Sequence, residues 1–336
     1  ADFTLSAKQG AGFDVADAYC RHDFLVLGTN NTVRNVTISY LYTPDTGGMG
    51  IRASQRGLDV LNKAGIVLPA GVKNILIENC RFEGMIAHHI KGRNCEGLTL
   101  IGCQIVGGFW AVSIFGAKDL VFRRCLFEKS AADGFKGGTD GGLFENCVFQ
   151  DNTRDGIDTT GGLNDTVVRN CIFRRLGREG MDLKCHYESE ADLARPQNHG
   201  IRVEKCVFHD MSNAFVFTLN DRGPDHAGKR LVTADNIAKL APHDIDINEC
   251  VFGHAEKPLR KWADGGYGVN HPTEQGEHMR VLFVKDGHSI RYRNARLSGD
   301  RIRMVYCLSQ GGNKNLSTEA AEAIAPAVTG NILDEP

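Results

Sequence analysis

The chain has 336 residues, 42% of them hydrophobic, which is enough to bury one large core or two smaller ones. Its formal net charge of −2 excludes a strong overall attraction to nucleic acid or to a membrane surface, so we expect neither as a partner. No apolar run reaches the roughly 20 residues that a membrane-spanning helix needs. Since the sequence begins at Ala1 and not at Met, we expect a secreted or periplasmic protein from which a signal peptide has been removed.

A repeated unit centred on a cysteine runs through most of the chain. The unit alternates apolar and variable residues, and an apolar residue follows two positions after the cysteine. The cysteines stand 22 to 24 residues apart as far as Cys171, and then 35 and 44 residues apart. The units are NILIENCRF (74–82), GLTLIGCQI (97–105), DLVFRRCLF (119–127), GLFENCVF (142–149), DTVVRNCIF (165–173), GIRVEKCVF (200–208) and DIDINECVF (244–252), preceded by NVTISYLY (35–42), which lacks the cysteine.

Each unit predicts three short strands. The apolar alternation shifts phase at Glu78 and Asn79, which indicates a tight corner between two strands. A third short strand follows about eight residues later, in 111–116, 133–138, 155–160, 179–184 and 213–218. Three short strands cannot enclose a core within one unit, but stacked coils can.

The sequence therefore predicts an all-β fold, a right-handed parallel β-helix that forms a single domain over residues 1–336. Regular coils are expected over about residues 30–255, with long loop insertions at 185–199 and 220–243. Residues 256–336 are expected to form irregular coils, including 288–297 and 301–308, and a short capping helix at 317–328.

The cysteines are expected to be structural. At equal positions of successive coils they form an interior column with about 4.8 Å between strands, where each thiol fills space beside stacked apolar side chains. Metal binding is not expected of them, because the sequence contains no CxxC pair. Asn79, Asn146 and Asn170 at the corner are also expected to be structural, and His88 and His89 on an earlier coil are expected to be structural or rim residues, not catalytic ones.

Acidic residues gather on the third strands. The alignment places an inward apolar column and, beside it, an outward column; a further column lies where the strands start. The inward column is Ile114, Phe135, Ile157, Met181 and Phe215. The outward column is Phe115, Lys136, Asp158, Asp182 and Val216, with Lys91 one coil before Phe115. The column at the strand starts is Asp133, Asp155, Glu179 and Asn213.

These columns bring several carboxylates to roughly 5 Å from one another. Like charges that close raise the pKa of one member unless a cation neutralises them. Calcium, which prefers carboxylate and carbonyl oxygens, is one such cation. The alternative is a solvated acidic ladder whose partners are Lys136 and Lys184, an arrangement that contributes little to stability.

The succession ADGF (132–135) and, one coil later, RDGID (154–158) resembles the calcium-binding coils of the family-nine polysaccharide lyases, which are parallel β-helix pectate lyases. The resemblance implies calcium ligation by Asp133, Asp155 and Asp158, and we add Glu179 from the same cluster. Arg154 stands where the family's DDGxD pattern has its first aspartate.

The resemblance also implies that a lysine abstracts the C5 proton of a uronate. The family's lysine lies on a GFK-type strand, and Lys136 occupies such a strand here, but on the ADGF coil itself. The matching place downstream holds Asp182, with Lys184 two residues later. Both lysines are therefore candidates for the base, provided that their pKa is lowered.

Further residues are candidates for substrate contact. Arg178, and less so Arg174 and Arg175, precede the EGMDLK strand and could bind a uronate carboxylate through two hydrogen bonds. The long insertions commonly form the walls of a site on such a scaffold. Their candidates are His186, Tyr187, Arg222, His226, Lys229 and Arg230.

The leading interpretation is a calcium-assisted lyase that cleaves an acidic, uronate-containing polysaccharide by β-elimination. A second is an inverting glycoside hydrolase, in which Asp155, Asp158 and Asp182 supply two carboxylates about 6.5–9.5 Å apart. A third is a carbohydrate-binding β-helix without catalysis, because a fold alone does not confer activity. The sequence gives no signal for an oligomeric state.

Overall fold

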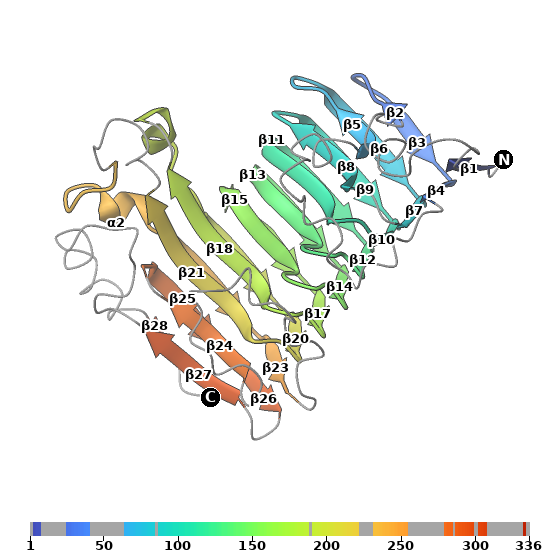
Figure 1. The fold of residues 1–336 in the computed structure, drawn as a ribbon. Coiled ribbons are helices and arrows are strands. Elements are labelled where there is room, and N and C mark those ends of the chain that lie inside the picture. The colour runs from blue at the N-terminus through green and yellow to red at the C-terminus, as the bar shows by residue number, and fades with distance from the viewer. Residues whose placement is uncertain are drawn as a thin grey trace, which may run out of the picture.

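The computed structural model describes residues 3–7, 25–40, 64–84, 87–187, 190–221, 231–254, 279–284, 286–298, 302–307 and 332–333. In these residues the chain winds through short strands that stack coil upon coil along one axis (Figure 1). Each strand pairs in parallel with the equivalent strand of the next coil, as β14 does with β17. The chain is therefore a parallel β-helix, as predicted.

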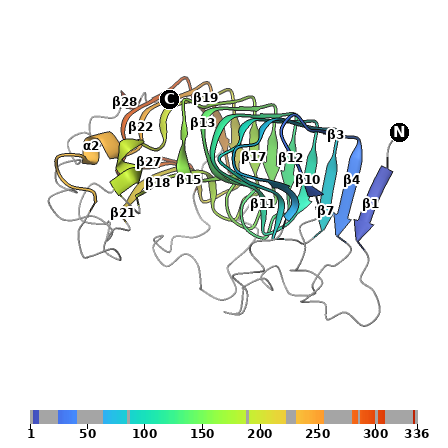
Figure 2. The same ribbon diagram turned by 90° about the horizontal axis from the view of Figure 1, so that it is seen from above.

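Each coil contributes a strand to three series. The first series is β1 (Phe3–Ala7), β4 (Val36–Tyr40), β7 (Arg81–Gly84), β10 (Gln104–Gly107), β12 (Leu126–Glu128), β14 (Val148–Gln150), β17 (Ile172–Arg174), β20 (Val207–His209), β23 (Val251–Gly253) and β26 (Arg296–Ser298). Figure 2 shows the N-terminal members of this series side by side.

The second series precedes the corner. It is β3 (Thr32–Arg34), β6 (Lys73–Glu78), β9 (Glu96–Ile101), β16 (Val167–Arg169), β19 (His199–Glu204), β22 (His243–Asn248), β25 (His288–Arg293) and β28 (Ile332–Leu333). The third series carries the acidic residues. It is β2 (Leu25–Val26), β5 (Ala64–Leu68), β8 (His88–Arg93), β11 (Trp110–Arg123), β13 (Phe135–Glu145), β15 (Ile157–Asn164), β18 (Glu179–Tyr187), β21 (Asn213–Asp221), β24 (Met279–Val284) and β27 (Ile302–Cys307). The C-terminal halves of β11 and β13 complete the second series.

The core lies inside the coils and consists of stacked columns. The Phe127, Phe149, Phe173 and Phe208 rings stack with centroids 4.5 to 4.9 Å apart. The predicted cysteine column is confirmed, since the described cysteines are buried free thiols. The Cys147 thiol donates to the carbonyl oxygens of Phe122 and Glu145 at 3.4 Å.

The corner before each cysteine requires a left-handed backbone. Asn79, Asn146 and Asn170 have φ angles of 52°, 56° and 52°, in the region that asparagine adopts more readily than most residues. Gly102 holds the same position one coil after Asn79, and a Cβ there would lie 2.7 Å from the Asn79 amide oxygen. The structural role predicted for these asparagines is confirmed.

One predicted register is wrong. The alignment placed Ile114 and Phe115 beside Phe135 and Lys136, whereas Val112 and Ser113 hold those places. The reason is that β11 runs through two series as one strand, with an irregularity between Ile114 and Ala117. Lys91 correspondingly pairs with Ser113.

In the region predicted to form irregular coils, β25, β26 and β27 each pair in parallel with the equivalent strand of the preceding coil. Residues 317–328, where a capping helix is predicted, lie outside the described part. The insertions contain a 3-10 helix (Glu190–Ala194) and α2 (Ile237–Leu240), a single turn of helix. Within the described ranges, no helix combines the length and apolarity needed to cross a membrane.

Candidate functional site

The predicted acidic columns meet on three neighbouring coils. Lys136 of β13, Asp158 of β15 and Asp182 of β18 are in register, and Val216 of β21 continues the row. At the strand starts, the Asp155 N–H donates to Asp133 Oδ1 at 3.3 Å, and the Glu179 N–H donates to Asp155 Oδ1 at 3.2 Å. We call Asp133, Asp155, Asp158, Glu179 and Asp182 the carboxylate cluster.

The carboxylate cluster is buried, so the alternative of a solvated acidic ladder is wrong. All five residues are at most 2% exposed. Four basic side chains lie against them and remain partly exposed: Lys136 at 15%, Arg154 at 15%, Arg178 at 13% and Lys184 at 17%. The layer nearer solvent is therefore cationic, above a layer of carboxylates.

Asp158 lies at the centre of this arrangement. The Lys136 Nζ is 2.5 Å from Oδ2 of Asp158, and the Lys184 Nζ is 2.9 Å from Oδ1. Lys184 also lies 2.8 Å from Oδ2 of Asp182, so it bridges two coils. Both oxygens of Asp158 are thus ion-paired with lysines of the chain itself.

The strand-start column is held by arginines. The Arg154 Nε lies 3.8 Å from Oδ1 of Asp133, and the Arg178 Nε lies 3.0 Å from Oε2 of Glu179. The Asn213 amide donates to Glu179 Oε1 at 3.2 Å and ends the column. Arg154, which the sequence presented only as a departure from the family pattern, is therefore a member of the site.

The pKa values of the cluster divide in two directions. Burial raises the pKa of Asp133 to about 7, against the opposing charge of Arg154, and burial also raises the pKa of Glu179 and Asp182. Burial opposes ionisation of Asp158 as well, but Lys136 and Lys184 lower its pKa below the usual value. Neighbouring carboxyl groups therefore favour different protonation states.

The two predicted base candidates differ in their surroundings. Burial works against the charge of Lys184, but Asp158 and Asp182 outweigh it and raise its pKa, so Lys184 is held as an ammonium ion. That is opposite to the lowered pKa that a lysine base requires. Lys136 instead has Asp158 on one side and the ring of Trp110 on another, with its Nζ 5.3 Å from the ring centroid.

Trp110 is a neighbour of the site that sequence reasoning missed. It packs against His88, with ring centroids 5.4 Å apart, and against Phe109, at 5.1 Å. The N–H of Ala111 donates to the Asp133 carbonyl at 3.0 Å, which places Trp110 beside the start of the acidic column. The correct register of β11 would have revealed this position.

The carboxylates alone have the spacing of a cation site, but the residues around them do not fit calcium. One oxygen each from Asp133, Asp155 and Asp158, and from Asp155, Glu179 and Asp182, lie within 4.8 Å of one another. However, the oxygens of Asp158 are already bonded to two ammonium groups, and a calcium ion would have to displace them. We therefore assign no step to calcium.

The same spacing argues against an inverting hydrolase. Within each triad, one oxygen of each carboxylate lies within 4.8 Å of the others, so Asp155 is closer to Asp158 and to Asp182 than the roughly 6.5–9.5 Å that an inverting pair needs to admit a water molecule. Asp155 and Asp158 are also fully buried, which leaves no room for that water.

The predicted substrate contacts divide three ways. Tyr187 is fully buried and its hydroxyl donates to the Leu240 carbonyl at 2.8 Å, so the prediction that it contacts substrate is wrong. His186 lies on the same strand as Lys184, is 9% exposed, and stays a prediction. Arg222, His226, Lys229 and Arg230 lie outside the described residues.

The predicted structural role of His89 is confirmed by its burial and by its contact of 3.2 Å with the Val106 carbonyl. Burial lowers its pKa to about 4, so His89 stays neutral near pH 7. His88 is also buried and packs on Trp110, as described above.

Comparison with known proteins supports the fold. A family model described as a right-handed beta helix region matches residues 93–238, which confirms the predicted hand. The sequence matches no curated protein. The structure is similar to the family 28 exopolygalacturonase of Yersinia enterocolitica, with a TM-score of 0.51, 11% identity, and coverage of 84% of this chain and 60% of that chain.

Two further solved structures are similar at lower scores. The tailspike protein of E. coli bacteriophage HK620 gives a TM-score of 0.49 and 12% identity, covering 92% of this chain and 56% of that chain. An alginate lyase from Paenibacillus sp. str. FPU-7 gives a TM-score of 0.39 and 10% identity, covering 89% of this chain and 99% of that chain. At these identities the likeness shows the fold alone. This chain spans about 60% of the length of the exopolygalacturonase.

Proposed function

We propose that this protein cleaves an acidic, uronate-containing polysaccharide by β-elimination at the carboxylate cluster. The observation that carries the proposal is the cationic layer: Lys136, Arg154, Arg178 and Lys184 lie against buried carboxylates and are each 13% to 17% exposed. Such a surface attracts an anionic ligand and places its carboxylate against fixed positive charges.

Elimination needs the uronate carboxylate to be neutralised, because this acidifies the C5 proton. Arg154, Arg178 and Lys184 supply that charge from within the protein, in the role that the family resemblance gives to calcium. The carboxylates beneath fix their positions, so no reorganisation is needed when the substrate binds.

Lys136 is assigned as the base. Its Nζ lies 3.8 Å from Asp133 Oδ2, so we assign this carboxylate as the group that takes up the lysine proton when the substrate is bound. The neutral amine then takes the C5 proton, the electron pair of that bond forms the C4–C5 double bond, and the C4–oxygen bond of the glycosidic linkage breaks. The departing oxygen takes up a proton.

The likeness in fold to a β-helix protein named an exopolygalacturonase is compatible with a polysaccharide substrate. The test is ultraviolet absorbance, because elimination leaves a conjugated 4,5-unsaturated uronate. A rise on one polyuronate supports the proposal; no rise on any polyuronate contradicts it.

A glycoside hydrolase is the second candidate. It is favoured by one observation, namely that the neighbouring carboxyls of Asp158 and Asp182 have pKa values shifted in opposite directions. New reducing ends without absorbance would identify it. Binding without cleavage would instead identify a carbohydrate-binding β-helix.

A further inference from the structure

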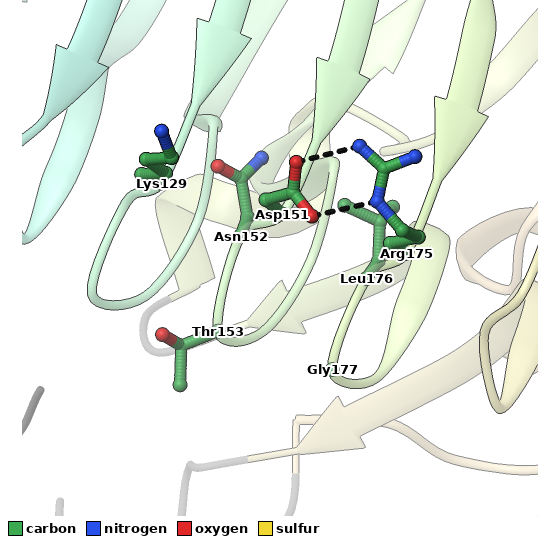
Figure 3. A pocket seen from close by; sticks show the side chains of 7 residues that line it. All are labelled: Lys129, Asp151, Asn152, Thr153, Arg175, Leu176 and Gly177. Atoms are coloured by element: carbon green, nitrogen blue, oxygen red, sulfur yellow. Dashed lines mark hydrogen bonds and ion pairs between the residues drawn. The ribbon is translucent and has the colours of Figure 1, made fainter. Parts of the chain in front are cut away.

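A pocket with a volume of about 490 Å³ lies beside the cluster, at the turns that follow β12, β14 and β17 (Figure 3). Lys129, Asp151 and Arg175 line it from successive turns. Their φ angles of 59°, 56° and 50° show that they hold the same left-handed turn position. The volume is within the range of about 300–1,000 Å³ that is typical of small-molecule sites.

The lining is polar and carries excess positive charge. Arg175 donates from Nε and from a terminal nitrogen to the two oxygens of Asp151, at 2.8 and 2.7 Å (Figure 3). Lys129 is 66% exposed, and its Nζ is 3.8 Å from the Glu128 carboxylate. Asp151 pairs with Arg175, whereas Glu128, the partner of Lys129, does not line the pocket, so the lining itself carries two cations and one carboxylate.

The base of the pocket is fixed. Asn152 and Leu176 are buried, and the amide oxygen of Asn152 accepts a hydrogen bond from the Ser130 N–H at 3.0 Å. At Gly177 a Cβ would come within 1.8 Å of the Thr153 carbonyl oxygen, so the two turns touch and only glycine fits. The pocket is therefore a rigid feature of the stacked turns.

The pocket and the cluster share the same edge of the coils. Thr153 and Gly177 line the pocket, and the residues that directly follow them are Arg154 and Arg178 of the cationic layer. Since consecutive Cα atoms are about 3.8 Å apart, the pocket and the cationic layer are neighbours on two successive turns.

We propose that this pocket is a second sugar subsite, which binds a neighbouring uronate of the same polysaccharide. Lys129 receives the uronate carboxylate, and the Asp151–Arg175 pair hydrogen-bonds to its hydroxyl groups. The subsite rests on the proposed function for the identity of its ligand. It makes the affinity of the protein depend on the length of the oligosaccharide.

The test measures calorimetric binding of short and long oligogalacturonates, oligomannuronates and oligoglucuronates to the wild type, Lys129→Ala and Arg175→Ala. Arg174→Ala is the matched control, because Arg174 also bonds to the preceding coil, through Gln150 at 2.8 Å, but does not line the pocket. The two pocket variants are expected to bind the long oligomer about tenfold more weakly, as for a lost charge-assisted hydrogen bond, and the shortest one unchanged.

Equal affinities of Lys129→Ala and Arg174→Ala for the long oligomer would overturn the subsite, even if Arg175→Ala fails to fold. Cleavage by the wild type, followed separately by absorbance, distinguishes the two proposals. If the pocket variants bound only the long oligomer more weakly and no unsaturated product formed, the lyase would be refuted and the subsite kept. Cleavage by the wild type, together with pocket variants that bind the long oligomer as tightly as the wild type does, would refute the subsite and keep the lyase.

Discussion

The ammonium group of Lys136 lies 2.5 Å from a carboxylate oxygen of Asp158, although the two residues are 22 positions apart in the chain. The stacking of β13 on β15 brings them into register. With Lys184 on the other oxygen, Asp158 organises two cations of the proposed active site. The following predictions depend on this arrangement and on the core beneath it.

Asp158→Asn should lower the free energy of unfolding by about 3–5 kcal/mol, because it leaves two largely buried ammonium groups without their shared counter-charge. Denaturant titration measures this loss. Glu145→Gln is the matched control: Glu145 also joins two basic side chains, Arg123 and Arg169, but these are 47% and 43% exposed. It should cost no more than about 1 kcal/mol. Equal effects of the two substitutions would contradict the central place of Asp158.

Lys136→Arg should abolish elimination, because arginine keeps the positive charge but does not lose its proton. Lys184→Arg should retain a measurable rate, since Lys184 acts as a cation between Asp158 and Asp182. Initial rates from ultraviolet absorbance compare the two variants. If Lys184→Arg were inactive while Lys136→Arg still cleaved the substrate, Lys184 would be the base and Lys136 the fixed cation.

Asp133→Asn should change how stability depends on pH. The pKa of Asp133 is about 7 in the folded chain and about 3.9 when unfolded, so the folded state binds its proton more tightly. The contribution of Asp133 to the free energy of unfolding is fully present below pH about 4, where the carboxyl is protonated in both states. It is lost as the pH rises through about 7, where the folded chain loses that proton. The variant should therefore gain stability relative to the wild type across that window.

Urea titrations of the wild type and Asp133→Asn at several pH values measure this difference. The charged groups that act on Asp133 are Arg154, Asp155, Asp158 and Lys136, and the substitution leaves all four in place. A difference in unfolding free energy that stays constant from pH 4 to pH 8 would show that Asp133 has no raised pKa.

Trp110→Leu should lower the rate, because the indole ring, whose centroid lies 5.3 Å from the Lys136 Nζ, no longer positions that side chain. Trp110→Phe keeps an aromatic face and should recover most of the rate. Kinetics on a cleaved polyuronate, with unfolding free energies measured in parallel, separate positioning of Lys136 from general destabilisation. Identical rates for the two variants would remove Trp110 from the site.

Cys147→Ala should lower stability by about 1–3 kcal/mol through a small cavity in the cysteine column, with the catalytic rate nearly unchanged. Cys147→Ser, of similar size, should keep a donor for the carbonyls of Phe122 and Glu145. Unfolding and initial-rate measurements on both variants test this. A lost rate at unchanged stability would assign the thiol a chemical role.

The sequence predicts the fold well because its signal is repeated. Inward positions such as Phe149 and Phe173 must match the coil on either side, so each coil confirms the next. The prediction fails where that repetition is interrupted, as in β11, where one strand crosses two series and shifts Val112 into the place expected for Ile114.

The site is less predictable than the fold. The alignment brings Asp155, Asp158 and Asp182 together, but it does not show that they are buried. Burial depends on which long side chains lie across them, and the alignment does not show that Arg154 and Arg178 lie against the cluster. Tyr187 shows the opposite error, because a residue at the edge of an insertion is part of the core.

The most direct measurement is the absorbance of unsaturated uronate during incubation with pectate, alginate, glucuronan and glycosaminoglycans, with calcium and with a chelator. The account predicts a rise on one substrate that the chelator leaves unchanged, because Lys136 and Lys184 already occupy the oxygens of Asp158 that calcium would need. A rise that requires calcium would contradict that use of the cluster. A flat trace on every substrate would contradict the lyase itself.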